Sequence, residues 1–332
     1  MPYAPDRFVC AFGSATLLKH LEAIQKELEG VKAAEDIEYI HRMRVATRRF
    51  RNALDIFSGC LPQKKHVLWQ RQIRLITRAL GAARDTDVQI DHIANILENT
   101  EDKKLKPGLN RLILRLRQKR QKLQRNVLTA LEKLLQSGVL DNIMRSTQKK
   151  LLPEEPGRPH SAALYVLSND VIQARLGALL AYETYIYTPE CKKELHAMRI
   201  EAKRLRYSLE TFASLYPGNL EEYIVRTRKM QELLGEIHDR DVWLEFLPQF
   251  LEAERARTQK YYGNQRIMLK IVPGIQHLER LEQTLRDDLY HQFLSTWAKW
   301  KTSHLWESLR EEISVHIPPQ EIYPPALPPA AS

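Results

Sequence analysis

Residues 41–51, HRMRVATRRFR, contain one histidine and five arginines and no acidic residue. An arginine guanidinium stays charged and donates two parallel hydrogen bonds to a phosphate group, while histidine adds a donor whose charge depends on pH. At 100° per residue, positions i, i+3, i+7 and i+10 of a helix lie in one stripe. The segment therefore predicts a helix with a row of anion-binding side chains along one face: His41, Arg44, Arg48 and Arg51.

A second copy of this pattern occurs 155 residues later in the chain. HAMRI at 196–200 matches HRMRV, and KRLR at 203–206 matches RRFR. A further motif, LGAARDTDV at 80–88, recurs as LGEIHDRDV at 234–242. Two motifs in the same order and with similar separation indicate a tandem duplication of a helical unit. The second cationic row then consists of His196, Arg199, Lys203 and Arg206.

The opposite faces of the two basic segments are apolar, so each helix is predicted to pack one side into a core. The apolar positions are Met43, Phe50, Leu54 and Phe57 in the first segment and Met198, Leu205, Leu209 and Phe212 in the second. Like charges spaced as in the cationic rows destabilise a helix by a few tenths of a kcal/mol per pair. A solvated charged face is the simpler interpretation of one such row. Its recurrence on the same face favours a bound anion, which offsets the repulsion.

Six other cations are weaker candidates for the same surface, because a solvated face explains each of them equally well. Arg74 and Arg228 occupy matching repeat positions, 154 residues apart. Four more share one face of a predicted long helix: Arg111, Arg115, Lys122 and Arg125. These six residues are predicted to extend the anion-binding surface.

The aspartates of the second motif, in RDTD and HDRD, admit two interpretations. His238 and Asp239 suggest a metal-dependent phosphohydrolase, but the first copy has Arg84 in place of His238. We favour a structural role in which the aspartates cap a helix or orient neighbouring arginines. Gly81 and Gly235 then mark a tight turn or a close helix crossing.

Motifs of the common enzyme classes are missing from the sequence, which contains no GxxxxGK[ST] loop, no HExxH and no GxSxG. We therefore expect no catalytic residue, no metal and no cofactor. Aromatic residues make up 8% of the chain, and none interleaves the basic rows as a platform for stacking nucleic-acid bases. The tryptophans are instead predicted to fill cores: Trp243, Trp297, Trp300 and Trp306.

Helical periodicity dominates the chain, and no segment alternates with a period of two, so the predicted fold class is all-α. The expected helices cover residues 14–31, 35–57, 65–80, 86–99, 109–136, 161–185, 190–215, 220–234, 241–257 and 273–314. The segment LLPEEPGRP at 151–159 cannot continue a helix and is predicted to link two repeats. The predicted repeats span 10–150 and 160–314, followed by a proline-rich tail at 315–332.

The composition predicts a soluble cytoplasmic protein with a polyanionic partner. The net charge is +10 and the isoelectric point is near 9.4, which favours nucleic acid, an acidic membrane surface or a phosphate polymer. No apolar stretch is long enough to predict a signal peptide or insertion into a membrane. Cys10, Cys60 and Cys191 are odd in number and lack CxxC spacing, which favours reduced thiols over a disulfide or a zinc site.

The pattern HxxR[VI]xx[RK]RxR, followed by LGxxxDxD and repeated in an all-helical chain, resembles the CHAD family, the conserved histidine α-helical domain. The resemblance covers about residues 10–310. It implies two pseudo-symmetric four-helix bundles around a basic central groove or pore that binds inorganic polyphosphate, without a cofactor and often without catalysis. The implied contacts are His41, Arg44, Arg48, Arg51, His196, Arg199, Lys203 and Arg206, with Arg49 and Arg204 as secondary contacts off the stripes.

Two alternative functions remain open at this point. One is a nucleic-acid-binding protein, and the other is a polyphosphate-processing enzyme with His41 or His196 as phosphate acceptor. Attachment to polyphosphate granules is compatible with the leading interpretation.

Overall fold

The structure is a computed structural model, and it describes residues 5–34, 36–153 and 160–314. These residues form helices and no strand, which confirms the predicted all-α fold class. The first half contains α1 (Arg7–Lys26), α2 (Leu28–Ala33), α3 (Ile37–Ile56), α4 (Gln63–Glu98), α5 (Lys106–Gln136) and α6 (Val139–Gln148). The second half contains α7 (Ala162–Leu180), α8 (Lys192–Phe212), α9 (Glu221–Tyr262), α10 (Met268–Thr302) and α11 (Leu305–Ser314).

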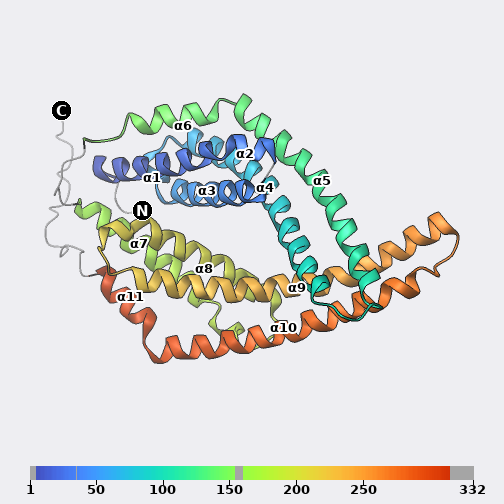
Figure 1. Ribbon diagram of the computed structural model, residues 1–332. Helices are drawn as coiled ribbons and strands as arrows, with labels where there is room; N and C mark the ends of the chain where they lie inside the picture. The colour runs from blue at the N-terminus through green and yellow to red at the C-terminus, as the bar shows by residue number, and fades with distance from the viewer. Residues whose placement is uncertain (1–4, 35, 154–159, 315–332) are drawn as a thin grey trace, which may run out of the picture.

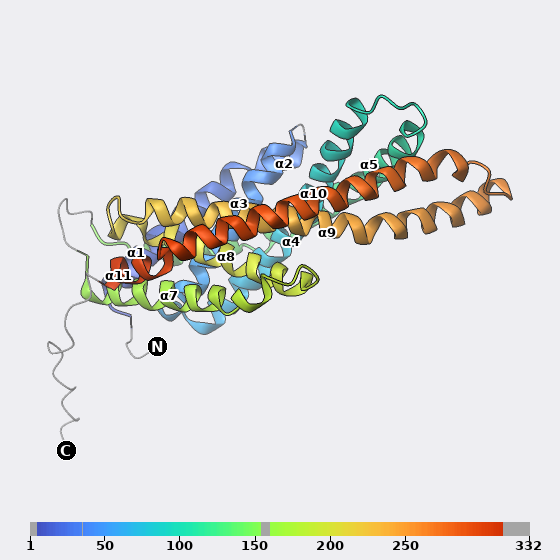
Figure 2. The same ribbon diagram turned by 90° about the horizontal axis from the view of Figure 1, so that it is seen from below.

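The two halves lie against each other, with the basic helices α3 and α8 in contact where they meet. Figure 1 shows α1 to α3 on one side of this junction and α7 to α9 on the other. Helix α5 leaves the first half and packs on α10 of the second. Beyond that crossing α9 and α10 run side by side as a long hairpin that projects from the rest of the molecule (Figures 1 and 2).

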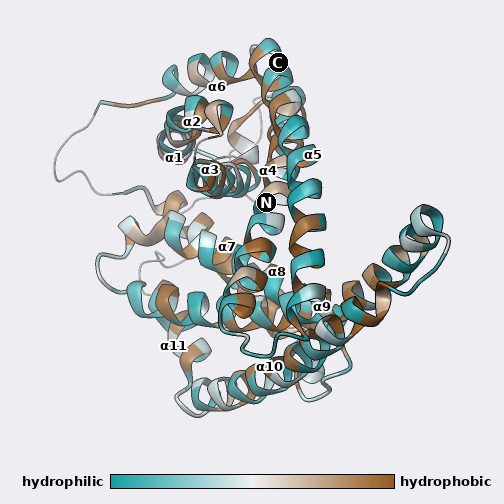
Figure 3. Cartoon of the chain, turned by 45° about the vertical axis from the view of Figure 1, so that its right-hand side comes forward, coloured by the Kyte–Doolittle hydropathy of each residue, from teal (hydrophilic) through white to brown (hydrophobic). Residues whose placement is uncertain are grey.

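Both basic helices bury the apolar faces that their periodicity predicts. All eight predicted core positions in α3, in α8 and just after α3 are at most 2% exposed. Figure 3 shows hydrophilic and hydrophobic stretches alternating along the helices, as expected of amphipathic helices that cover a core. The four tryptophans predicted to fill cores are also buried: Trp243, Trp297, Trp300 and Trp306.

The buried side chains form two clusters, and neither cluster belongs to one half of the chain alone. The larger cluster joins α1, α3 and α6 to α7, α8 and α11. The smaller one gathers residues from the end of α4, the start of α5, the second part of α9 and the first part of α10. Both halves therefore depend on each other for burial. The repeat boundaries at 10–150 and 160–314 stay a prediction from the sequence. The tail at 315–332 and most of the linker lie outside the described residues.

Helices α4 and α9 are each continuous where the sequence predicted two shorter helices, so those predicted breaks are wrong. Gly81 lies within α4 and Gly235 within α9. An interior glycine costs a helix about 1 kcal/mol relative to alanine, which packing along a long helix outweighs. The aspartates that follow these glycines lie inside the helices and cap neither end.

A close crossing joins α5 to α10, and it requires glycine on both helices. A Cβ atom on Gly108 would collide with the carbonyl oxygen of Ile271, and one on Gly274 would collide with that of Leu105. The two backbones thus approach more closely than any side chain would allow. This contact fixes the projecting hairpin of α9 and α10 to the first half.

The prediction of reduced thiols is wrong for two of the three cysteines. Cys10 in α1 forms a disulfide with Cys60, and their Cα atoms are 5.2 Å apart. Cys60 lies in a short 3-10 helix after α3, which returns the chain to the start of α1. The partners are 50 residues apart in sequence, so only tertiary packing reveals the pair. Cys191 is free and half-buried.

A buried carboxylate joins the two halves at the base of the projecting hairpin. Glu282 of α10 is fully buried. Its Oε1 lies 2.6 Å from His92 Nε2 of α4, and its Oε2 accepts a hydrogen bond of 2.6 Å from Arg240 of α9. Glu254 plays a similar part nearby, because it is buried and accepts a hydrogen bond of 2.6 Å from Arg115 of α5. Each carboxylate compensates cations that α9 and the first half bring together.

Replacing Glu282 with alanine is expected to destabilise the protein by about 3–5 kcal/mol, because Arg240 and His92 would lose their buried partner. The free energy of unfolding, measured in urea, checks this value. Asp288→Ala is the matched control, since Asp288 is an exposed acid on the same helix. A loss below about 1 kcal/mol for Glu282→Ala would show that water replaces the carboxylate.

Candidate anion-binding site

The two cationic rows meet at the contact between α3 and α8. All eight residues of the rows are half-buried, and none is fully exposed. An ion pair of 2.9 Å between Arg49 and Glu210 ties the two helices together beside the rows. The Arg48 guanidinium of α3 lies 6.0 Å from the Tyr207 ring centre of α8. Helix packing thus places the cations of both halves on one shared surface.

The cations are close enough to lower one another's pKa. Burial lowers the pKa of Arg48, and the nearby charges of Arg44, Arg199 and Arg206 lower it further. Burial also lowers the pKa of Lys203 to about 7, with the cations Arg48, Arg199 and Arg44 adding to the effect. A lysine with such a pKa is only partly charged at neutral pH. Burial is the larger cause of both shifts, and the contribution of the other cations shows that members of both rows lie within electrostatic reach of one another.

The histidines at the head of each row carry hydrogen-bonding atoms with no partner. Among the described residues, nothing pairs with His41 Nδ1, His196 Nδ1 or Arg199 Nε, although all three atoms are out of contact with solvent. Buried polar atoms are normally hydrogen-bonded, so these three atoms are exceptions to that rule. Burial lowers the pKa of both histidines, assisted by Arg84 at His41 and by Arg199 at His196.

His238 lies directly against His196, with the ring centres 3.9 Å apart. Burial, together with the neighbouring His196 and Arg199, lowers the pKa of His238 to about 4. Arg84, at the matching position of the first half, lies close enough to affect His41. The sequence did not single out Arg84 or His238 as neighbours of the rows, although both lie within the LGxxxDxD pattern, directly before its first aspartate.

The aspartates of the LGxxxDxD motifs orient arginines, as one of the two structural interpretations predicted. Asp85 accepts a hydrogen bond of 3.2 Å from Arg44. Burial raises the pKa of Asp239, and the nearby Arg199 opposes this rise. The second aspartate of each motif pairs with a cation outside the rows, Asp87 with Arg120 at 2.7 Å and Asp241 with Arg286 at 3.1 Å.

Gly81 and Gly235 lie beside Arg44 and Arg199. A Cβ atom on Gly81 would lie 3.6 Å from Arg44 Nε, and one on Gly235 would lie 3.9 Å from Arg199 Cδ. Both are ordinary van der Waals distances to a side chain, so neither glycine marks a close helix crossing. The tight-turn interpretation is wrong as well, because both glycines lie inside helices. The motif arginine of each half passes over the matching glycine.

Several of the weaker candidates have other partners. Arg49 is paired with Glu210, and Arg204 is paired with Glu201. Arg115 and Arg111 both lie near the buried Glu254, at 2.6 and 3.9 Å, so they serve the contact between α5 and α9. The remaining four are exposed: Arg74 on α4, Lys122 and Arg125 on α5, and Arg228 on α9.

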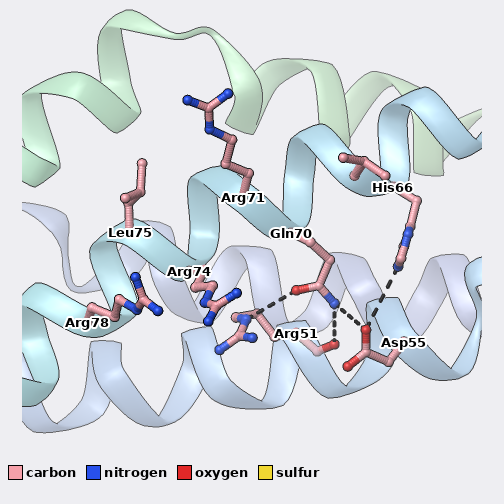
Figure 4. Close-up of a pocket in the computed structure, with 9 residues that line it drawn as sticks. Arg51, Asp55, His66, Gln70, Arg71, Arg74, Leu75 and Arg78 are labelled. Carbon is pink, nitrogen blue, oxygen red and sulfur yellow. Dashed lines mark hydrogen bonds and ion pairs between the residues drawn. The ribbon is translucent and has the colours of Figure 1, made fainter.

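Arg74 joins Arg51 in a basic hollow between α3 and α4 (Figure 4). Arg71 and Arg78 line the same hollow, and the sequence analysis missed both. Their spacing was the available signal, since positions 71, 74 and 78 of a helix lie in one stripe. The Arg51 side chain is held by a 3.1 Å hydrogen bond to Gln70.

The fold and the site define an all-α protein whose two halves bring their cationic rows together. The family model for the CHAD domain matches residues 15–248. The chain belongs to the CHAD domain family, a family related to polyphosphate. None of the curated proteins matches the sequence. None of the described helices combines the length and apolarity needed to cross a membrane.

Two solved structures share the fold. One is the crystal structure of the CHAD domain from the plant Ricinus communis, with 23% identity and a TM-score of 0.57, covering 93% of this chain and 91% of that one. The other is PptA from Streptomyces chartreusis, with 15% identity and a TM-score of 0.58, covering 88% of this chain and 98% of that one. At these identities the similarity concerns the fold alone.

Proposed function

We propose that this protein binds inorganic polyphosphate through the rows of α3 and α8 and that it does so without catalysis. The observation that carries the proposal is the convergence of Arg48 and Lys203 with Arg44 and Arg199. Burial lowers the pKa of Lys203 to about 7, and the neighbouring cations contribute to that shift. A bound anion offsets the electrostatic repulsion among the cations of this site. Membership of a family related to polyphosphate supports the same ligand class.

The shape and chemistry of the site favour a linear phosphate chain over nucleic acid. Cations follow one another along both helices, and a phosphate polymer offers charge at every unit to match them. The forked guanidinium groups of arginine suit phosphate oxygens. The nearby Tyr207 is 5% exposed and lies beneath Arg206, so it offers no open face on which a base could stack.

Titration calorimetry with long-chain polyphosphate tests the proposal. By analogy with counterion release from nucleic acids, the logarithm of the binding constant should fall linearly with the logarithm of salt concentration, with a slope of about −4 or steeper. A slope near zero, or no measurable binding at low salt, would contradict electrostatic capture of a polyanion by the two rows.

Two further measurements separate this function from its alternatives. Competition by RNA at one ionic strength should be weak, and displacement of polyphosphate by an equal concentration of RNA phosphate would favour a nucleic-acid-binding protein. Incubation of polyphosphate with the protein and Mg²⁺ should release no orthophosphate. Release that is lost in His41→Ala or His196→Ala would identify an enzyme instead.

A further inference from the structure

The basic hollow beside Arg51 adjoins the end of the α3 row and has a volume of about 560 Å³. In Figure 4, Arg74 of α4 lies beside Arg51 of α3, and Arg71, Leu75 and Arg78 project from the same face of α4. Arg51 belongs to both features, as the last member of the α3 row and as part of the lining of the hollow. A ligand at the row therefore has a cationic path onward into the hollow.

The arginines of the hollow are available to a ligand. Arg71, Arg74 and Arg78 are exposed, and no carboxylate in the described ranges forms an ion pair with them. The hollow has one acidic residue, Asp55, which accepts a hydrogen bond of 2.5 Å from Gln70 and lies 3.9 Å from His66. Four arginines around one engaged carboxylate leave a net positive charge that suits phosphate oxygens.

The pKa of Arg51 responds to charges on α8 and to charges in the hollow. Burial lowers its pKa, Asp55 opposes that effect, and the cations Arg74, Arg78 and Arg204 lower the pKa further. Arg204 lies on α8, in the second half, whereas Arg74 and Arg78 lie on α4. Arg51 is thus within electrostatic reach of the α8 segment and of the hollow at once.

The matching place in the second half lacks this cluster. Positions 71 and 78 correspond to Val225 and Glu232 at the repeat offset of 154 residues, and Arg228 alone corresponds to a hollow arginine of α4. The counterpart of Arg51 is Arg206, which lies 3.7 Å from Glu210. The cationic surface therefore continues beyond the α3 row, in the first half of the chain, and does not continue in the same way beyond the α8 row.

We propose that the hollow formed by Arg51, Arg71, Arg74 and Arg78 is a second phosphate subsite, which receives the continuation of a polyphosphate chain already seated on the α3 and α8 rows. This inference rests on the proposed function. It adds that long chains leave the rows on the side of the first half, so that the protein discriminates chains by length. A short phosphate oligomer occupies the rows and makes no use of the hollow.

The test compares two double variants with two ligands. Arg74→Ala with Arg78→Ala removes two exposed cations from the hollow, and Lys229→Ala with Arg255→Ala removes two exposed cations from α9 that lie outside the rows and the hollow. Calorimetric affinities are measured for long-chain polyphosphate and for tripolyphosphate at one ionic strength. The four side chains are exposed, so neither variant disturbs a core, and circular dichroism checks that both fold.

The hollow variant should bind long-chain polyphosphate about tenfold or more weakly and should bind tripolyphosphate like the wild type. The α9 variant should match the wild type with both ligands. Unchanged long-chain affinity in the hollow variant, or an equal loss in the α9 variant, would overturn the one-sided subsite. A loss for both ligands in the hollow variant would also overturn it, because the hollow would then be the primary site. If the wild type binds neither ligand, the proposed function itself fails.

Discussion

Simultaneous replacement of Arg44, Arg48, Arg199 and Arg206 with alanine is expected to abolish binding of long-chain polyphosphate. Hydrogen bonds to charged groups contribute about 1.5–3 kcal/mol each, so the loss of four contacts corresponds to roughly 6 kcal/mol or more. That energy weakens the dissociation constant by about four orders of magnitude. Titration calorimetry at low salt measures the change.

The fold of this variant should survive, because the four arginines repel one another in the free protein. Asp85, the partner of Arg44, has a side chain that is 68% exposed, so it stays solvated when the arginine is removed. Thermal unfolding is expected to show a midpoint no lower than that of the wild type. A large drop in the midpoint would mean that the arginines hold α3 and α8 together, and the binding result would then carry no weight.

A matched control separates the site from net charge. Arg255, Lys260, Arg266 and Lys270 are four exposed cations on the projecting hairpin of α9 and α10. Their replacement with alanine removes the same charge from a surface far along the chain from the rows. Affinity near that of the wild type is expected. An equal loss in both variants would contradict a localised site.

Binding of polyphosphate at pH 8 is expected to take up about one proton, and Lys203 is the reason. Burial and neighbouring cations lower its pKa to about 7 in the free protein, so the side chain is mostly neutral at pH 8. A bound polyanion favours the charged form and raises that pKa. Proton uptake is therefore linked to binding, and the affinity falls as pH rises above about 7.

Calorimetry in buffers of different ionisation enthalpy measures this uptake. His41 and His196 contribute at lower pH, because their pKa values are lowered from 6.5, so pH 8 isolates the lysine. Lys203→Arg should bind with almost no proton uptake at pH 8, since arginine stays charged. The control Lys229→Arg alters an exposed lysine of α9 and should behave like the wild type. Equal uptake in all three proteins would assign the proton to another group.

Periodicity explains why the helices, their buried faces and the members of the two rows were predictable. Met43 and Met198 are buried, and the stripes headed by His41 and His196 lie on the other sides of their helices. An amphipathic helix has only one way to turn its apolar face inward, so the direction of its cations follows. The all-α fold class depends on the same local pattern and needs no knowledge of long-range contacts.

Other features depend on contacts between distant residues, which local patterns do not encode. The continuity of α4 through Gly81 reflects packing along its whole length, and the pairing of Cys10 with Cys60 reflects the return of the chain to α1. Arg111 and Arg115 share a cationic face with Lys122, yet the fold places a buried carboxylate, Glu254, beside the first two alone. An arginine that contacts a ligand and one that forms an internal ion pair have the same residue type and spacing in the sequence, so the sequence does not distinguish them.

The sequence by itself determined two helices with matching rows of cations, because residue type and a spacing of 3.6 per turn are sufficient to define a stripe. Only the tertiary structure decided that the rows share one surface, since the contact between α3 and α8 depends on cores built from both halves. The pKa of Lys203 follows from that contact, because burial and the cations of the other helix act on it only after the halves have packed.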